Sequence, residues 1–273
     1  MKEKGINNLS NNELEALVSG IAHEVKLPIA NIISSVNLLK RKLQNTISEE
    51  DKVYFEIIYN NCNQILRHSE HTTKAIMFLR ENEDIYLKRE NINLCLLALC
   101  EGAKPFALSN HVELNIVCEC DEIFAAINRE LFSSVILNLI SNSIKYTKEG
   151  NSVIICLKKE ADNIMITVED KGIGIKTEDL EKIFEPFYTT QNTKSSISST
   201  GLGLYIVKSI VSLHKGKVFA ESEVGKGTKM TVMIPSNLKE SNELFLGDSK
   251  FESKEDYKKD LEILIARELS DCL

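Results

Sequence analysis

The feature of this sequence that most constrains its fold is an apolar pattern near the N-terminus with the period of an α-helix. Between residues 14 and 43, apolar side chains recur in steps of three and four residues, so they form one stripe along a helix. A stripe of this kind must be buried against another element. We therefore expect a long packed helix over residues 8 to 45. The stripe comprises Leu14, Val18, Ile21, Val25, Ile29, Ile32, Val36, Leu39 and Leu43.

A histidine lies beside this stripe. His23 falls between Ile21 and Val25, off the apolar face, where it can meet solvent or a partner. Glu24 follows it directly, and Pro28 crowds the carbonyl of Glu24, so we expect the helix to bend or loosen just after His23. Taken alone, this stretch fits a reactive histidine or an ordinary surface histidine equally well.

A second helix is predicted after a short break. Ser48 precedes the acidic residues 49 to 51, a pattern typical of an N-cap and a first helical turn. The helix should run to about Leu79. One helical hairpin buries little apolar surface, so we expect it to pair with a second copy as a homodimeric four-helix bundle. Its apolar positions are Val53, Ile57, Ile58, Ile65, Ala75, Ile76 and Leu79.

Composition excludes several classes of function. The chain has 273 residues, which allows two domains, and 43% of them are hydrophobic. Its net charge is −7 and it has no run of Lys and Arg, so no nucleic-acid partner is expected. No stretch approaches the ~20 apolar residues of a membrane span, the nearest being residues 92 to 100. We therefore expect a cytoplasmic protein.

The seven cysteines show no metal-binding or disulfide pattern. Their number is odd and no two have the CxxC spacing. We interpret them as small core side chains in a reducing compartment.

Beyond a charged connector at residues 82 to 90, the pattern changes to alternating helices and strands. Helices are predicted at 92 to 108, 128 to 146 and up to His214, and strands at 114 to 120, 123 to 127, 153 to 159, 164 to 170, 217 to 222 and 229 to 235. This order predicts a mixed sheet covered by helices. The fold class is therefore α+β: a hairpin at 8–82, an α/β-sandwich domain at 83–236 and an acid-rich tail at 237–273.

Three polar groups in the second region suggest a nucleotide site. Asn138, Asn142 and Lys145 share one face of a predicted helix, where amide oxygens can join magnesium and a lysine can meet phosphate. A solvated helix face explains the same pattern. We expect Val135, Leu139 and Ile140 to point to the core instead.

The second group, Asp170 with Gly172 and Gly174, ends a predicted strand. An ionised carboxylate accepts hydrogen bonds only, so it would select the amino group of adenine over the carbonyl of guanine. A plain Asp/Gly turn is the alternative.

The third group opens a helix at residues 199 to 204. Glycines at a helix start leave backbone N–H groups available to phosphate oxygens. A single GxG motif is weak evidence for a phosphate site on its own. Before it lies IFEPFY, for which one hypothesis is that Phe184 and Phe187 anchor a loop that is otherwise mobile, and the alternative is an ordinary surface loop with hydrophobic pins.

Taken together, AHEVKLP, NLISNSIKYT, DKGIGI, IFEPFY and STGLGLYIVKSIVSLHKG resemble the bacterial sensor histidine kinases in order and spacing, from about residue 10 to Pro235. The resemblance implies a dimerisation hairpin and a Bergerat-type ATP-binding domain. It also implies ATP and Mg²⁺ as cofactors, with His23 as phosphoacceptor, Glu24 assisting it, and Asn138 and Asn142 serving magnesium. The nucleotide-binding residues that it implies are Asn138, Asn142, Lys145, Tyr146, Asp170, Gly172, Gly174, Thr200, Gly201, Leu202 and Gly203.

The implied activity is ATP-dependent autophosphorylation of His23 followed by transfer to an aspartate of a separate response regulator. A phosphorelay or nucleotide-binding regulatory protein with little autokinase activity is the alternative. One departure concerns Leu27, where the family usually has Thr or Asn to orient a water molecule. We therefore expect weak or absent phosphatase activity.

The input to such a kinase is not evident in the sequence. About ten residues precede the hairpin, so we expect a sensory partner protein to deliver the signal. The C-terminal tail is the second candidate for this role. The tail carries Tyr257, Leu261, Leu264, Ile265 and Leu269 at helical spacing. These residues fit a docking helix or a helix that covers the edge of the domain.

Overall fold

The computed structural model describes residues 11–43, 48–77, 85–119, 122–190, 201–241, 264–265 and 268–269. The chain forms two compact units, Met1–Glu81 and Asn82–Leu273.

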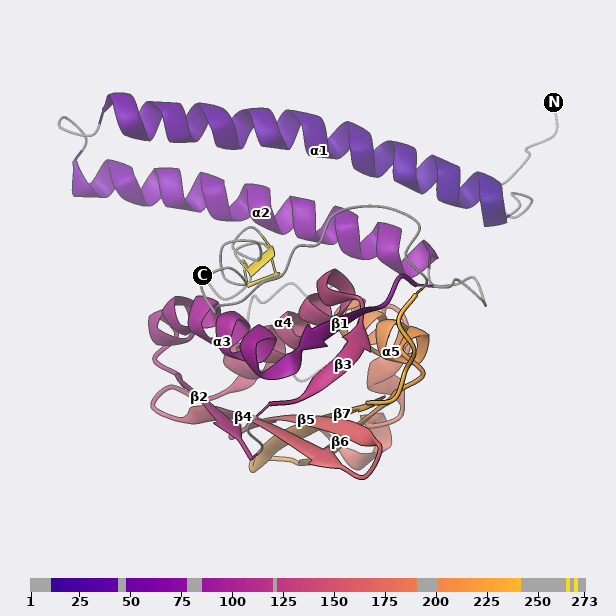
Figure 1. Ribbon diagram of the computed structural model, residues 1–273. Helices are drawn as coiled ribbons and strands as arrows, with labels where there is room; N and C mark the ends of the chain where they lie inside the picture. The colour runs from indigo at the N-terminus through magenta and orange to yellow at the C-terminus, as the bar shows by residue number, and fades with distance from the viewer. Residues whose placement is uncertain are drawn as a thin grey trace. The chain divides into compact units, whose positions relative to one another are not determined.

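The first unit is a helical hairpin of α1 (Asn11–Lys42) and α2 (Glu49–Met77), shown in Figure 1. α2 begins as predicted, because the backbone N–H of Asp51 donates to Ser48 Oγ at 3.1 Å. The Ser48 hydroxyl in turn donates to the Asp51 carboxylate at 2.7 Å. α1 continues through Pro28, and the bend expected there stays a prediction.

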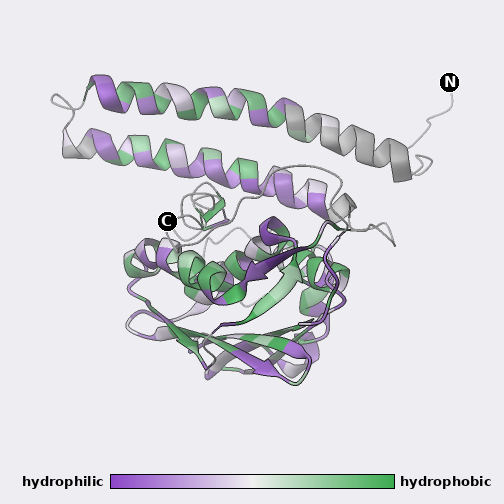
Figure 2. Cartoon of the chain, viewed as in Figure 1, coloured by the Kyte–Doolittle hydropathy of each residue, from purple (hydrophilic) through white to green (hydrophobic). Residues whose placement is uncertain are grey.

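The core of the hairpin is small. Ile29 of α1 packs with Cys62 and Leu66 of α2, flanked by Val25 and Ile33. Much of the apolar stripe is uncovered within one chain, including Ile32, Leu39 and Leu43, and the expected burial of this stripe in a bundle of two hairpins stays a prediction. Figure 2 shows apolar residues recurring along both helices. Among the hairpin side chains that the structure describes, the large exposed apolar ones are Leu27, Ile32, Leu38, Leu39, Leu43, Val53, Tyr54, Ile57, Ile58 and Ile65.

The second unit is built on a five-stranded sheet, which confirms the predicted mixed sheet. Its order is β2 (Glu113–Cys118), β4 (Ser152–Glu160), β5 (Asn163–Asp170), β7 (Gly227–Pro235) and β6 (Lys217–Glu223). β2 and β4 pair in parallel and the other pairs are antiparallel. A separate ribbon joins β1 (Lys88–Asn91) to β3 (Phe124–Ile127).

Helices α3 (Ile92–Ser109), α4 (Arg129–Tyr146) and α5 (Gly203–Leu213) cover one face of this sheet (Figure 1). The burial of β4 alternates accordingly: Val153, Ile155 and Leu157 are buried, while Ile154 is exposed. The α+β fold class is thus confirmed. The largest fully buried side chains are Phe132, Ile92, Leu96, Leu99, Ile127, Ile136, Leu137, Leu139, Ile140, Ile144 and Ile155.

Among the described residues, one helix, α3, is long and apolar enough to be a candidate membrane span. The apolar run that begins at Ile92 continues as helix beyond Cys100 to Ser109. Half of this helix is buried inside the folded chain, as in the core helix of a domain. Its cysteines, Cys95 and Cys100, are buried free thiols, and burial raises the pKa of each to about 12.

Candidate nucleotide site

The asparagines predicted from helical spacing lie on α4. Asn138 is only 1% exposed, so the solvated-face explanation does not hold for it. Its Nδ2 donates to the carbonyl of Ser134 at 2.9 Å and to Glu268 Oε2 at 3.3 Å. Asn142 lies one turn further along and is half-buried. Val135, Leu139 and Ile140 are buried in the core, as predicted.

The amide oxygen of Asn138 is an unsatisfied buried acceptor. Within the part of the chain that the structure describes, Asn138 Oδ1 has no hydrogen-bond partner. It faces the start of α5, where a Cβ on Gly203 would lie 2.8 Å away. A side chain at this position would therefore crowd the oxygen. Because oxygen ligands are those that Mg²⁺ prefers, an unsatisfied amide oxygen fits a cation site.

Asp170 ends β5 with its carboxylate buried. Oδ1 accepts the backbone N–H of Gly172 at 2.8 Å and that of Thr228 at 3.2 Å. Oδ2 accepts, from the residues that the structure describes, only a long bond of 3.5 Å from Ser143 Oγ of α4. Burial raises the pKa of this carboxyl group, and the three hydrogen bonds oppose the rise.

The loop after β5 lies against the C-terminal end of α4. The N–H of Ile173 donates to the carbonyl of Tyr146 at 3.3 Å, and Thr147 forms a β-bridge with Gly172. A Cβ on Gly172 would lie 2.3 Å from the Tyr146 oxygen, so only glycine allows this approach. Lys145 lies with its ammonium 5.7 Å from the Tyr146 ring. The structure thus brings Asp170 and the end of α4 together.

The glycines at the start of α5 contact two other parts of the site. Gly201 packs against the backbone of Phe187 and Tyr188, and Gly203 against Asn138. Leu202 is the N-cap of α5, and among the described residues no side chain caps this helix. Gly174 packs instead against the turn between β6 and β7, at Glu223. Thr200 lies outside the described residues.

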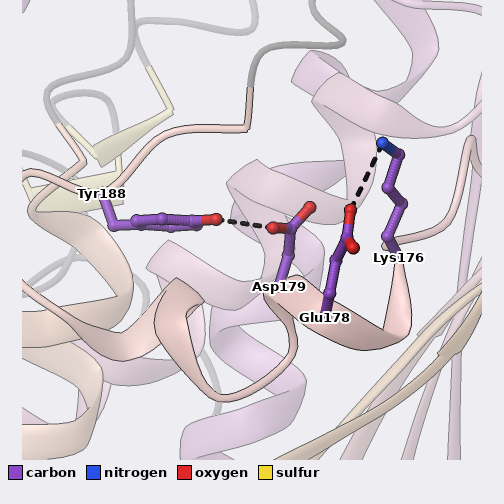
Figure 3. A network of polar contacts seen from close by, with 4 residues as sticks. All are labelled: Lys176, Glu178, Asp179 and Tyr188. Atoms are coloured by element: carbon purple, nitrogen blue, oxygen red, sulfur yellow. Dashed lines mark hydrogen bonds and ion pairs between the residues drawn. The ribbon is translucent and has the colours of Figure 1, made fainter.

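Tyr188, the last residue of the IFEPFY segment, is hydrogen-bonded to the preceding one-turn helix. The Tyr188 hydroxyl donates to Asp179 Oδ1 at 2.6 Å, and this bond raises the pKa of Tyr188 to about 12 (Figure 3). Lys176 and Glu178 form an ion pair at 3.5 Å beside it. Phe184 is buried as expected, but Phe187 is 71% exposed and has φ of 63°, so it is not the second anchor predicted.

The predicted phosphoacceptor belongs to the other unit. His23 is part of α1, and its side chain lies outside the described residues. Glu24 is exposed on the same helix. Leu27, one turn after His23, is 57% exposed.

Two buried polar residues that bond to helices of the site carry no local sequence signal. His214, at the end of α5, accepts the N–H of Asn128 with Nε2 at 3.0 Å, and its Nδ1 donates to the carbonyl of Ile210 at 2.8 Å. Burial lowers the pKa of this imidazole, so it is neutral and ties α5 to the start of α4. The other residue is Glu268, which comes from the C-terminal tail.

Comparison with known proteins gives a consistent result. Residues 127–238 match the family described as histidine kinase-, DNA gyrase B-, and HSP90-like ATPase. The chain is 30% identical over 227 residues to the sensor histidine kinase RppB of Synechocystis sp., covering 81% of this chain and 49% of that protein. It is 27% identical over 227 residues to the sensor histidine kinase WalK of Bacillus subtilis, covering 82% of this chain and 37% of that one. The chain thus spans about half the length of these curated relatives, or less.

Solved structures share the fold. Full-length ShkA in complex with AMPPNP superposes with a TM-score of 0.65 at 19% identity, covering 83% of this chain and 47% of that one. The histidine kinase AdeS of Acinetobacter baumannii superposes with a TM-score of 0.55 at 21% identity, covering 79% of this chain and 98% of that one. The histidine kinase ThkA, solved in complex with the response regulator protein TrrA, superposes with a TM-score of 0.55 at 21% identity. The match covers 84% of this chain and 64% of that one.

Proposed function

We propose that this chain, a relative of the sensor histidine kinases across both its hairpin and its ATPase domain, is an ATP-dependent protein-histidine kinase. It phosphorylates His23 from ATP and passes the phosphoryl group to an aspartate of a separate response regulator. The observation that carries the proposal is the meeting of α4 with the end of β5, which gathers Asn138, Asn142 and Asp170 in one domain.

In this proposal each part of the site contacts one part of ATP. Asp170 accepts a hydrogen bond from the amino group of adenine through Oδ2, because Oδ1 is already satisfied by the backbone. Lys145 and Tyr146 border the nucleotide. The backbone of Gly172, Gly174, Gly201 and Gly203 forms the phosphate side of the pocket. Thr200 and Leu202 complete the proposed nucleotide-binding residues.

Asn138 and Asn142 are the residues proposed to hold magnesium. Magnesium held by these two amide groups would neutralise negative charge on the phosphate groups of ATP. The unsatisfied oxygen of Asn138 gives the fit for such a ligand.

The phosphoacceptor step uses α1. A ring nitrogen of neutral His23 forms a bond to the γ-phosphorus as the bond from that phosphorus to the β,γ-bridging oxygen breaks, and ADP leaves. Glu24 orients the ring and stabilises the positive charge that develops on it. The phosphoryl group then passes from His23 to the carboxylate oxygen of the regulator's aspartate.

The proposed partners follow from the surface of the hairpin and from the relatives. The exposed apolar residues of α1 and α2 support a homodimer through a four-helix bundle. ThkA, which shares the fold, was solved with its response regulator. A sensory partner protein is proposed to deliver the input to the chain in the cytoplasm.

The test is incubation of the purified chain with γ-labelled ATP and Mg²⁺, scoring label that is acid-labile and base-stable. Wild type should be labelled, and His23→Gln and Asn142→Ala should not. His111→Asn is the matched control, since His111 is exposed and Asn tolerates its φ of 54°. ATP binding without any label would favour the phosphorelay or nucleotide-binding regulatory protein instead.

A further inference from the structure

The C-terminal segment packs on the same helices that carry the nucleotide site. Ile265 and Leu269 are buried, although they lie beyond the residues that match the ATPase family. The Cδ1 atom of Ile265 fills the space beside Gly102 of α3, where a Cβ would lie only 2.4 Å from it. The described part of the tail therefore packs closely on this domain, with Ile265 in contact with α3 at Gly102.

Glu268 extends from this segment onto α4. It is 1% exposed, and its two oxygens accept hydrogen bonds from residues one helical turn apart. Oε1 accepts from Ser134 Oγ at 3.0 Å, and Oε2 accepts from Asn138 Nδ2 at 3.3 Å. A buried carboxylate is thus held directly against the proposed magnesium ligand.

These bonds fix the orientation of the Asn138 amide. The carbonyl of Ser134 and the carboxylate of Glu268 are both acceptors, so the atom that meets them must be the NH₂ nitrogen. The amide oxygen consequently points the other way, toward Gly203, where it has no hydrogen-bond partner among the described residues. An amide that donates to a carboxylate is also polarised, which places more negative charge on its oxygen.

We propose that Glu268 is a positioning residue for the cation site. It holds the side chain of Asn138 with its oxygen directed at the metal and makes that oxygen a better ligand, in the way that groups behind a metal ligand orient and tune it. The inference rests on the proposed role of Asn138 in binding magnesium. It assigns to the C-terminal segment a function in the affinity of the nucleotide site for Mg²⁺.

The test measures the dissociation constant of ATP on the full chain across a titration of Mg²⁺, and again in EDTA. Glu268→Ala should raise the Mg²⁺ concentration needed for half-maximal tightening of ATP binding by about tenfold. Its affinity for ATP in EDTA should match that of wild type. For Glu268→Gln, the Mg²⁺ concentration at half-maximal tightening should fall between those of wild type and Glu268→Ala. The glutamine oxygen still accepts a hydrogen bond from Asn138 but carries no charge. Glu240→Ala, at an exposed acidic residue before the segment, is the control.

The outcomes separate this inference from the proposed function. Melting temperatures identify any variant that fails to fold. If Glu268→Ala does not fold, the isosteric Glu268→Gln still tests the inference. If wild type binds Mg-ATP and neither folded variant changes the Mg²⁺ dependence, the inference alone is overturned. It is also overturned if the variants bind ATP more tightly, since the segment would then compete with nucleotide. If wild type shows no ATP binding, the proposed function fails as well.

Discussion

At the scale of single residues, the two oxygens of Asp170 have different surroundings. Oδ1 accepts two backbone N–H groups, whereas Oδ2 accepts only the long bond from Ser143. The carboxylate therefore keeps one oxygen with capacity for a further donor. The amino group of adenine supplies such a donor.

Replacing Asp170 with Asn should weaken ATP binding by about 10- to 100-fold. The backbone N–H groups would hold the single amide oxygen, so the NH₂ group would face the amino group of adenine and leave both donors unpaired. Calorimetric titration with ATP measures the effect. Glu169→Gln is the control, because Glu169 is the exposed neighbour on the same strand. Unchanged ATP affinity in Asp170→Asn would argue against this carboxylate as the adenine contact.

His214 should make the domain less stable in mild acid. Its pKa in the folded chain is lowered from 6.5 by burial, so the folded state binds fewer protons than the unfolded state. Its contribution to the free energy of unfolding is therefore fully present above pH 6.5 and is lost as the pH falls below that value. Urea unfolding at several pH values between 7.5 and about 5 measures this loss.

His214→Gln provides the comparison for the pH series. Glutamine can still accept from the N–H of Asn128, but it does not titrate. The difference in unfolding free energy between wild type and variant should therefore shrink or reverse as the pH falls. Parallel pH profiles would show that another group causes the acid sensitivity.

The sequence predicted the site residues that follow a local pattern. Asn138 and Asn142 were proposed from helical spacing, and Asp170 from its place at the end of a strand, and their roles stay predictions. His214 and Glu268 were not proposed, because their partners lie 86 and 134 residues away along the chain. The burial of Asn138 was missed for the same reason, since part of its cover comes from the tail.

At the scale of elements, periodic segments were predicted almost to their ends. β4 was expected at 153 to 159 and spans Ser152–Glu160, and α4 was expected from residue 128 and begins at Arg129. The one-turn helices Thr177–Asp179 and Lys182–Phe184 were not predicted, because a single turn is too short to show a period. Phe187 was misjudged because residue type alone does not distinguish an anchor from an exposed ring.

The face of α1 that carries Leu27 leads to a prediction about dephosphorylation. An alkyl group cannot orient a water molecule, so the chain should not accelerate loss of phosphate from a phosphorylated response regulator. Leu27→Thr should raise that rate by providing a hydroxyl. Leu38→Thr on the same helix is the control, since both leucines are 57% exposed.

The measurement follows the phosphorylated regulator over time, after free nucleotide is removed, with each variant added. Rapid dephosphorylation by wild type would contradict the prediction.

At the scale of the whole molecule, the hairpin leaves an apolar surface that one chain does not cover. Ile57 is 49% exposed in the first half of α2, with the exposed Val53 before it and Ile65 after it. Pairing two hairpins would remove this surface from water, and each buried side chain of this size contributes about 1.5–3 kcal/mol. A dimer is therefore the expected state.

Light scattering coupled to size exclusion should give wild type twice the chain mass of 30.8 kDa. Ile57→Lys should shift it to the mass of one chain, because a charge in the dimer core lacks a partner. Glu56→Lys introduces the same charge at the adjacent exposed position and should stay dimeric. A monomeric wild type, or a dimeric Ile57→Lys, would exclude this face as the interface.

The central strand pair has a consequence for how this domain can vary. β5 and β7 are paired residue by residue up to Asp170 and Thr228, although residues 171 to 227 separate those two positions in the chain. The entropy lost in closing such a loop grows only with the logarithm of its length, and doubling the length costs about 0.6 kcal/mol. A change of length between these two positions therefore costs little loop-closure free energy where it leaves α5 and β6 intact. Natural variation or loop grafting in this stretch can therefore change the binding properties of the site while β5 and β7 stay paired.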